Sequence, residues 1–424
     1  MTVIAYLAPE LPALSATFVY EELLALERRR LLVRAFAVHR AAAPVAGQQA
    51  LTDRTHVLYD GQPLKSVLSA LQSLSSFGSG AWRALRWLAA DMLRVGLHRA
   101  NAWKLPWQWL AGARLGQQLR RQGCTHLHVH FAHVPTQIAM YASAFTGIPF
   151  SVMAHANDIF ERGLLLPQKA HRALMMMTIS EFNRRHLLAV GVAASKLAVV
   201  RCGVSFAPRA ASPRFEPKAS YRIGTLGRLV EKKGVEDLLR AVAQLGPQPW
   251  QLQVSIAGDG PLRAELEALV ASLGLTDQVS FEGALAHTEV SAWLHGLDVF
   301  VLACKADARG DMDGIPVVLM EAMSQCVPVL TTRLSGIPEL VLNEQTGLLV
   351  SPGDPAALAA ALARLLNAPT LRASLAEAAL AHVEAEFGQS VNIDRLLGII
   401  DPSALRAAAS APAPACAHPV HHTP

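Results

Sequence analysis

Short apolar runs alternate with longer amphipathic segments along most of the chain. In the first half, the apolar runs cover residues 3–7, 33–38, 126–130, 149–155, 174–179 and 197–200. In the second half, they cover residues 223–226, 252–257, 279–281, 299–302 and 327–331. Strands of a buried parallel sheet are continuously apolar and are joined by helices, so the pattern predicts repeated βαβ units. The chain is therefore expected to be an α/β protein.

The chain is long enough to form two such sheets, because 424 residues exceed what one core usually contains. Residues 206–217 are rich in Pro and Arg and are predicted to be a linker. It separates an N-terminal domain (1–205) from a C-terminal domain (218–385) that a helix (386–401) follows. Doubly wound domains bind ligands outside the carboxyl ends of their strands, so we expect them to face each other across a central cleft. The Ala-, Pro- and His-biased tail (402–424) is predicted to be disordered.

The composition favours a cytoplasmic protein. Hydrophobic residues make up 52% of the chain and charged residues 17%, yet no apolar run reaches the roughly 18 residues of a membrane-spanning helix. The first residues lack the basic and apolar regions of a signal peptide. The five cysteines include no CxxC pair and fit a reducing compartment.

The charge is unevenly distributed between the two halves. Through Ser212 there are 23 Lys and Arg against 10 Asp and Glu, whereas the remainder has 15 against 23. A basic first half suggests an anionic partner, and no nucleic-acid-binding motif accompanies it, so a phospholipid membrane is favoured. The predicted helical segment 64–121 contains five of the seven tryptophans with Arg and Lys between them, a composition that suits an anionic bilayer surface. The alternative is a set of core aromatics with arginines that extend to solvent.

Two carboxylates, Asp313 and Glu321, frame an apolar stretch that follows a Gly-rich loop. Pro316 suits the first turn of a helix whose buried body is predicted over 317–323. The loop and the helix N-terminus would present backbone N–H groups to an anion, and the carboxylates could bind hydroxyls. This layout indicates a nucleotide-sugar site.

A basic loop follows the predicted strand 223–226. In it, Arg228 and Lys233 could bind a diphosphate through charge-assisted hydrogen bonds, although a solvated surface position is the alternative. The next strand ends in AGDGPL at 257–262, which lacks the third glycine of a dinucleotide fingerprint and is a weak signal for a nicotinamide cofactor.

Four histidines cluster at His126, His128, His130 and His133. The first three alternate on one face of a predicted strand. No Cys or carboxylate stands near them in the sequence, so we predict no metal site there.

These loops lie in one order along the chain together with several other motifs. Asp313 and Glu321 belong to DGIPVVLMEAMS, which resembles EGFPLVLLEAMA, the stretch with two glutamates that marks family 4 of the retaining glycosyltransferases. Glu321 aligns with the second glutamate, and Asp313 replaces the first with a side chain one methylene shorter. Collinear segments resemble the bacterial exopolysaccharide and lipopolysaccharide branch of that family: PELPALSATFVYEELLALERR, HVHFAHVPTQIAM, PFSVMAHANDIF, TISEFNRRHL, VRCGV, SGIPELV and TGLLVSPGD.

The resemblance implies the GT-B architecture, in which two Rossmann-like domains face each other, with a C-terminal helix that crosses back to the N-terminal domain. It also implies roles on the donor side. Arg228 and Lys233 would hold the donor phosphates, Glu321 the ribose hydroxyls and Asp313 the donor sugar. The backbone amides of Gly314 and Ile315 would meet the β-phosphate or the sugar, and Leu285 lies in the loop near the base.

For the facing domain, the resemblance implies that His155 lines the cleft and stabilises the reacting centre. Asp158 would place the acceptor or orient His155, and Ser15 and Thr17 lie in the acceptor-side loop and helix. Retention would proceed by front-face attack, in which the leaving phosphate takes the acceptor proton. No metal or other cofactor is expected.

The function predicted from the sequence is transfer of a hexose from a UDP- or GDP-linked donor to a lipid-linked saccharide during surface polysaccharide assembly. The enzyme would act at the cytoplasmic face of the membrane. One alternative is a nucleotide-sugar epimerase on the same fold. Another is a degenerate, non-catalytic partner subunit, which the replacement at Asp313 motivates.

Overall fold

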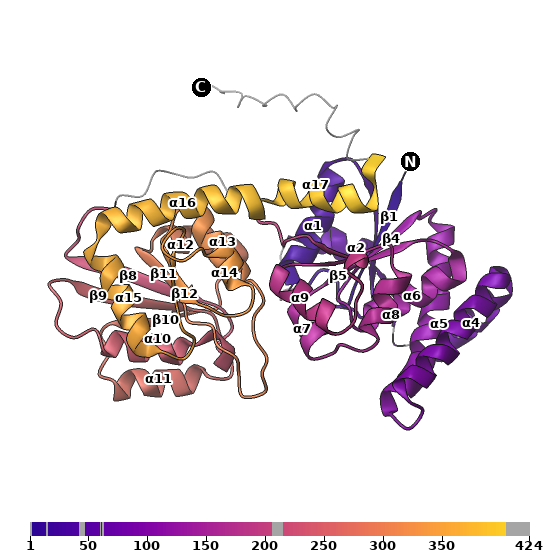
Figure 1. The fold of residues 1–424 in the computed structure, drawn as a ribbon, viewed down its shortest axis with the longest axis horizontal. Helices are drawn as coiled ribbons and strands as arrows, with labels where there is room; N and C mark the ends of the chain where they lie inside the picture. Colours follow the sequence, from indigo (N-terminus) through magenta and orange to yellow (C-terminus); the bar gives the residue numbers. More distant parts are fainter. Residues whose placement is uncertain are drawn as a thin grey trace, which may run out of the picture.

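A computed structural model describes residues 2–13, 16–41, 47–59, 61, 63–205 and 215–403 of the chain. Two parallel sheets lie side by side, each covered by helices on both faces (Figure 1). Most of the predicted linker, residues 206–214, and the tail from residue 404 lie outside the described residues, as does Ser15.

The N-terminal sheet has seven parallel strands in the order β3-β2-β1-β4-β5-β6-β7. These are β1 Val3–Ala8, β2 Leu32–Ala37, β3 His56–Val57, β4 His126–His130, β5 Phe150–Ala154, β6 Met176–Thr178 and β7 Leu197–Val199. The strand order reverses between β1 and β4, so the loops that follow these two strands diverge and leave a crevice at their carboxyl ends.

Helices cover both faces of this sheet. They are α1 Thr17–Arg28, α2 Gln49–Arg54, α3 Pro63–Leu74, α4 Ser79–Val95, α5 Ala100–Arg121, α6 Val134–Thr146, α7 Ala156–Phe160, α8 Leu166–Arg172 and α9 Glu181–Ala189. The short 3₁₀ helices are η2 Ser75–Phe77 and η3 Ala194–Lys196. The predicted helical segment 64–121 therefore forms α3, α4 and α5, which pack on α6 and on one another.

The C-terminal sheet has six parallel strands in the order β10-β9-β8-β11-β12-β13. These are β8 Ser220–Leu226, β9 Gln251–Ala257, β10 Val279–Gly283, β11 Val299–Leu302, β12 Val329–Thr332 and β13 Leu348–Val350. Its helices are η4 Glu231–Lys233, α10 Val235–Ala243, α11 Arg263–Ser272, α12 His287–His295, α13 Val317–Ser324, α14 Ile337–Leu340, α15 Pro355–Asn367 and α16 Pro369–Phe387. Here the order reverses between β8 and β11, which makes the carboxyl ends of these strands the expected ligand site.

All predicted strands are present, and two short strands, β3 and β13, were not predicted. The two residues of β3 are too few for a strand pattern, and the apolar run of β13 stops at Gly347 and Ser351. The equally short β6 and β7 were recognised because they lie in longer apolar runs, 174–179 and 197–200. The helix predicted over 317–323 is α13, which begins after Pro316.

A final helix, α17 Gln389–Ile400, packs against α1 of the N-terminal domain. Ile393, Leu396 and Leu397 of α17 are buried in the apolar core that α1 shares with β1 and β2. Together α16 and α17 run along both domains (Figure 1).

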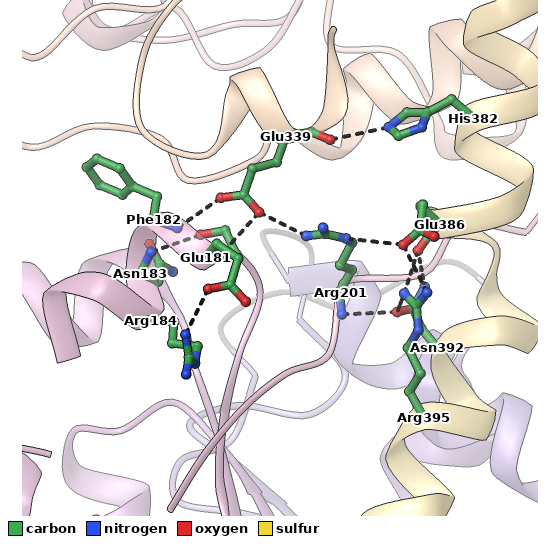
Figure 2. A network of polar contacts seen from close by, with 11 residues as sticks. Glu181, Phe182, Asn183, Arg184, Arg201, Glu339, His382, Glu386, Asn392 and Arg395 are labelled. Atoms are coloured by element: carbon green, nitrogen blue, oxygen red, sulfur yellow. Dashed lines mark hydrogen bonds and ion pairs between the residues drawn. The ribbon is translucent and has the colours of Figure 1, made fainter. Parts of the chain in front are cut away.

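Glu339 of α14 makes a second contact between the domains (Figure 2). Its carboxylate accepts hydrogen bonds from the backbone N–H groups of Glu181 and Phe182 at 2.9 Å each. These are the first N–H groups of α9, which lack partners within the helix. Arg201 also donates to Glu339 at 3.0 Å, and its Nε lies 3.9 Å from Glu386. The network holds the carboxyl ends of the two sheets toward each other.

Candidate functional site

An ion pair occupies the reversal point of the C-terminal sheet. Lys233 follows β8, and its Nζ lies 2.6 Å from Oδ2 of Asp313, which follows β11. Lys232 lies 3.5 Å from Asp313 and 2.7 Å from Asp311. Burial alone would raise the pKa of Asp313, but the charges of Lys233 and Lys232 outweigh this effect and hold the pKa below its ordinary value. Both partners of the Lys233–Asp313 pair are therefore charged.

The backbone of Gly314 and Ile315 leads from this ion pair into α13. Their N–H groups have no hydrogen-bond acceptor among the described residues, and no side chain caps α13. A Cβ at Gly314 would lie 3.6 Å from Cβ of Ala156 and 3.1 Å from Cδ1 of Ile179, which both belong to the N-terminal domain. The loop thus offers free N–H groups beside the facing domain.

A cavity of about 440 Å³ lies between the domains and contains Glu321 of α13. Thr17 and Phe18, from the N-terminus of α1, line its other side. Burial raises the pKa of Glu321, and the nearby His287 partly offsets this effect. The cavity therefore brings a predicted donor-side carboxylate together with a predicted acceptor-side residue, Thr17.

Arg228 and Leu285 lie outside that cavity. The Arg228 side chain is exposed and has no ion-pair or hydrogen-bond partner in the part of the chain that the structure describes. Leu285 is half-buried, and the residue of its loop that lines the cavity is His287. Sequence reasoning missed His287, although its position at the start of a helix after a strand could have indicated it.

His155 follows β5 at the start of α7 and is only 6% exposed. The rings of Phe18 and Phe131 cover it, with centroids 4.8 and 4.7 Å from the imidazole. Burial lowers its pKa well below the ordinary value, so the ring is neutral at pH 7. His155 was expected to line the cleft. Instead it lies beneath Phe18, which lines the cavity in its place.

Asp158 is wholly buried, which does not suit placement of an acceptor, whereas its contacts agree with the alternative role of orienting His155. Its carboxylate accepts hydrogen bonds from the backbone N–H groups of Ala132 and of His155, the latter at 2.9 Å. Burial raises its pKa, and the hydrogen bonds and Lys169 oppose the rise. Asp158 therefore fixes the backbone on which His155 is mounted.

Glu22 of α1 lies among the histidines of β4. We predicted no metal site there because no carboxylate is near these histidines in the sequence, but the fold places Glu22 beside them. Its Oε1 is 3.2 Å from Nε2 of His130 and 3.5 Å from Nε2 of His128. Nδ1 of His130 is in turn 3.3 Å from Nε2 of His155. Glu22, His128 and His130 could together present three ligand atoms to a metal ion. The hydroxyl of Tyr6, however, already donates to Glu22 and lies 2.9 Å from Nε2 of His130.

Comparison with known proteins agrees with this architecture. Residues 210–382 match the family "Glycosyl transferases group 1". The colanic acid biosynthesis glycosyltransferase WcaL of Escherichia coli K12 is 32% identical over 364 residues, which cover 82% of this chain and 89% of WcaL. The amylovoran biosynthesis glycosyltransferase AmsK of Erwinia amylovora is 34% identical over 253 residues, 58% of this chain and 62% of AmsK. The crystal structure of Anabaena HepE in complex with UDP has the same fold, with a TM-score of 0.68, 16% identity, and coverage of 94% of this chain and 99% of HepE.

Two facing parallel-sheet domains with a site at the strand-reversal point define a glycosyltransferase of the GT-B architecture. The chain belongs to the group 1 family of glycosyl transferases. This membership identifies the chain as a transferase rather than an epimerase. In the part of the chain that the structure describes, no helix is long and apolar enough to span a membrane.

Proposed function

We propose that this enzyme transfers a hexose from a UDP- or GDP-linked donor to a lipid-linked saccharide during assembly of an extracellular polysaccharide. The observation that carries the proposal is the pairing of Lys233 with Asp313 at the strand-reversal point, next to free backbone N–H groups. The names of WcaL and AmsK place those relatives in colanic acid and amylovoran biosynthesis, and HepE binds UDP.

On the donor side, the diphosphate would bind where cations and N–H groups converge. Lys233 and Arg228 supply positive charge, and Gly314 and Ile315 supply backbone donors. Glu321 lies about one and a half helical turns beyond Pro316, so its carboxylate can accept hydrogen bonds from the ribose hydroxyls while the α13 N-terminus meets phosphate. Asp313 would then contact the donor sugar.

Cleavage of the anomeric C–O bond leaves negative charge on the nucleoside diphosphate. Lys233, Arg228 and the fixed N–H groups would stabilise that charge as it develops, which is the work a metal ion does in other transferases. We therefore propose a reaction without a metal or other cofactor.

The carboxylates near the site are poorly suited to act as a covalent nucleophile. Asp158 is buried and bound to backbone N–H groups, and Asp313 is paired with Lys233. Retention is what the family resemblance implies. The lack of a suitable carboxylate argues against its double-displacement route and so supports front-face attack, in which the leaving phosphate accepts the proton of the acceptor hydroxyl. His155 would act from beneath Phe18, either through movement of that ring or by supporting the cavity wall.

The acceptor would approach from the N-terminal domain, where Thr17 and Phe18 line the shared cavity and Ser15 precedes them. A lipid-linked acceptor requires the enzyme to work at a membrane. The basic N-terminal half suits the anionic inner face of the cell membrane.

Release of nucleoside diphosphate tests the proposal. The protein is mixed with a panel of UDP- and GDP-sugars, with and without a lipid-linked saccharide, after a thermal-shift screen selects the donors that bind. Acceptor-dependent release supports transfer to that saccharide. A donor sugar converted to its epimer without release of diphosphate would contradict the proposal.

A further inference from the structure

A second and larger cavity, of about 900 Å³, lies on the N-terminal domain and shares no lining residue with the cavity that contains Glu321. It is bounded by α4, by α8 and by the segment that leads from α9 into η3. Cationic side chains line it, and no carboxylate among the described residues does. The cations are Arg83, Arg86, Arg94, Arg172 and Lys196.

Internal contacts fix some of these cations and leave others available. Arg172 is neutralised by the buried Asp91, which it contacts at 2.6 and 2.9 Å. Arg86 has no hydrogen-bond or ion-pair partner among the residues the structure describes, and Arg94 has only Asp91 at 3.9 Å. Lys196 donates one hydrogen bond, to the carbonyl of Ala173 at 2.8 Å. Excess positive charge therefore remains in the cavity.

The helix dipole explains the positions of only some of the cations that line the cavity. A cation in the last turn of a helix favourably meets the helix dipole, and Arg94 and Arg172 occupy such turns of α4 and α8. Arg83 and Arg86, however, lie in the first half of α4, where the dipole gives no reason for a cation. Arg83 donates from Nε to the carbonyl of Ala144 at 2.8 Å, near the end of α6, and this contact accounts for its position. Arg86 has no such partner among the described residues, so its position suits an anionic partner outside the protein.

An exposed apolar stripe runs along α4 beside the cavity. Trp82, Leu85 and Leu93 form it, and Trp82 and Leu93 are 72% and 69% exposed. Arg86, one turn from Trp82, borders both the stripe and the cavity. Since a helix rises about 1.5 Å per residue, the stripe is roughly 16 Å long.

The stripe continues around the tip of the hairpin that α4 and α5 form. Leu97, Trp103 and Trp107 are exposed there, and Trp103 Nε1 donates to the carbonyl of Leu97 at 2.9 Å. This hairpin lies at the end of the molecule away from the C-terminal domain (Figure 1). Large exposed apolar side chains beside a basic cavity indicate a bilayer interface, because the acyl region can receive the former and lipid phosphates the latter.

We propose that the cavity between α4 and α8 binds the phosphate headgroups of anionic phospholipids while the apolar stripe of α4 and the hairpin tip enter the bilayer. The inference rests on the proposed function in one respect, since a lipid-linked acceptor gives the enzyme a reason to be at a membrane. Nucleic acid also carries phosphate, but it offers no apolar phase for Trp82, Leu93 and Trp107. The bilayer therefore explains both surfaces.

Sedimentation with vesicles tests the proposal on the full chain at low salt. Wild-type protein should bind vesicles that contain phosphatidylglycerol and not pure phosphatidylcholine vesicles. The double variant Arg86→Ala/Arg94→Ala should bind about 30-fold more weakly, at about 1 kcal/mol per basic residue near the surface. Asp91 keeps its two contacts with Arg172 in this variant, so the fold should be retained.

A matched control removes the same net charge elsewhere. Arg121 and Arg185 are exposed and do not line the cavity, so Arg121→Ala/Arg185→Ala should bind much as the wild type does. Equal weakening in the two double variants would overturn the proposal, because binding would then follow net charge alone. Leu93→Ser should weaken vesicle binding without a change in the response to salt, and an unchanged Leu93→Ser would remove the role of the stripe.

A soluble phosphate distinguishes a headgroup from a free anion. A thermal-shift assay with inorganic phosphate is run on the wild-type protein and on Arg86→Ala/Arg94→Ala. If phosphate stabilises the wild type but not the variant, and vesicles do not bind, then the cavity is a site for a free phosphate and the membrane assignment is wrong. Nucleoside diphosphate release is measured on the same preparations with a soluble donor. A wild-type protein that releases nucleoside diphosphate but does not bind phosphatidylglycerol vesicles would refute this inference alone. A wild-type protein that binds these vesicles but shows no acceptor-dependent release would refute the proposed function alone.

Discussion

Asp313→Asn should strengthen the binding of the free nucleoside diphosphate and slow sugar transfer. In the structure, Asp313 neutralises Lys233 across 2.6 Å. A donor phosphate must therefore share Lys233 with a carboxylate of its own sign. Asn has almost the same shape as Asp and removes only the charge, so Lys233 becomes fully available to the diphosphate. Transfer should slow because the proposed contact of Asp313 with the donor sugar loses its anionic acceptor.

The size of the effect follows from the geometry of the ion pair. A phosphate oxygen about 2.8 Å from Lys233 Nζ would lie roughly 4–5 Å from the Asp313 carboxylate. The repulsion between unit charges at that distance is about 4 kcal/mol at an effective dielectric constant of about 20, and about 1 kcal/mol in water. Asp313 is 15% exposed, and salt and Lys232 screen it further. We expect the lower end of this range, about 1 kcal/mol, which corresponds to about fivefold tighter binding.

Isothermal titration calorimetry with UDP and GDP measures this change. Asp311→Asn is the matched control, because Asp311 pairs with Lys232 at 2.7 Å and forms no ion pair with Lys233 among the described residues. Its effect should be several-fold smaller. Circular dichroism verifies the fold of both variants. Weaker or unchanged nucleotide binding by Asp313→Asn would refute the reasoning, since Lys233 would then not be the phosphate ligand that Asp313 opposes.

Three further predictions concern buried carboxylates. Burial raises the pKa of Glu321 in the folded state, so the contribution of Glu321 to stability is full below the unfolded pKa and is lost as pH rises through the folded pKa. Glu321→Gln should therefore melt above the wild type at pH 8 and at nearly the same temperature at pH 4. A lower melting temperature of the variant at pH 8 would contradict this sign. Glu339→Ala removes the acceptor of two α9 N–H groups and the partner of Arg201. It should lower the free energy of unfolding, measured by urea denaturation, by roughly 2–3 kcal/mol, and Glu339→Gln should recover part of this loss. Burial would raise the pKa of Glu22, but His130 and His128 lower it, so Glu22 contributes stability above the unfolded pKa that is lost as pH falls through the folded pKa. Glu22→Gln should be less stable than the wild type at pH 7 and should lose less stability on acidification to pH 4. An equally steep loss in acid would argue against a lowered pKa of Glu22.

Much of the fold could be predicted because its signals are local. Apolar runs mark the buried strands, and Pro316 marks the start of α13, so each element needs only its own residues to be recognised. β3 and β13 were missed because the apolar runs that contain them are shorter than those around most of the other strands. The division into two sheets followed from chain length and from the composition of residues 206–217.

Individual residues of the candidate site could be predicted from local motifs, but the contacts between them could not. The pairing of Lys233 with Asp313 joins positions 80 residues apart and depends on β8 and β11 being neighbours, which is a property of strand order and not of either loop. The position of Glu22 beside His130 has the same origin, because α1 packs over β4 from a distant part of the chain. Asp158 was assigned to the acceptor side because a local motif does not reveal burial.

The central claim is that the nucleotide sugar is held by the C-terminal domain through Lys233 and Glu321. The most direct test is release of nucleoside diphosphate in the presence of acceptor, measured for the wild type, Lys233→Ala and Glu321→Ala, with circular dichroism spectra that show each variant folded. Both variants should lose transfer activity while the folded structure persists. Wild-type rates in both folded variants would contradict the claim.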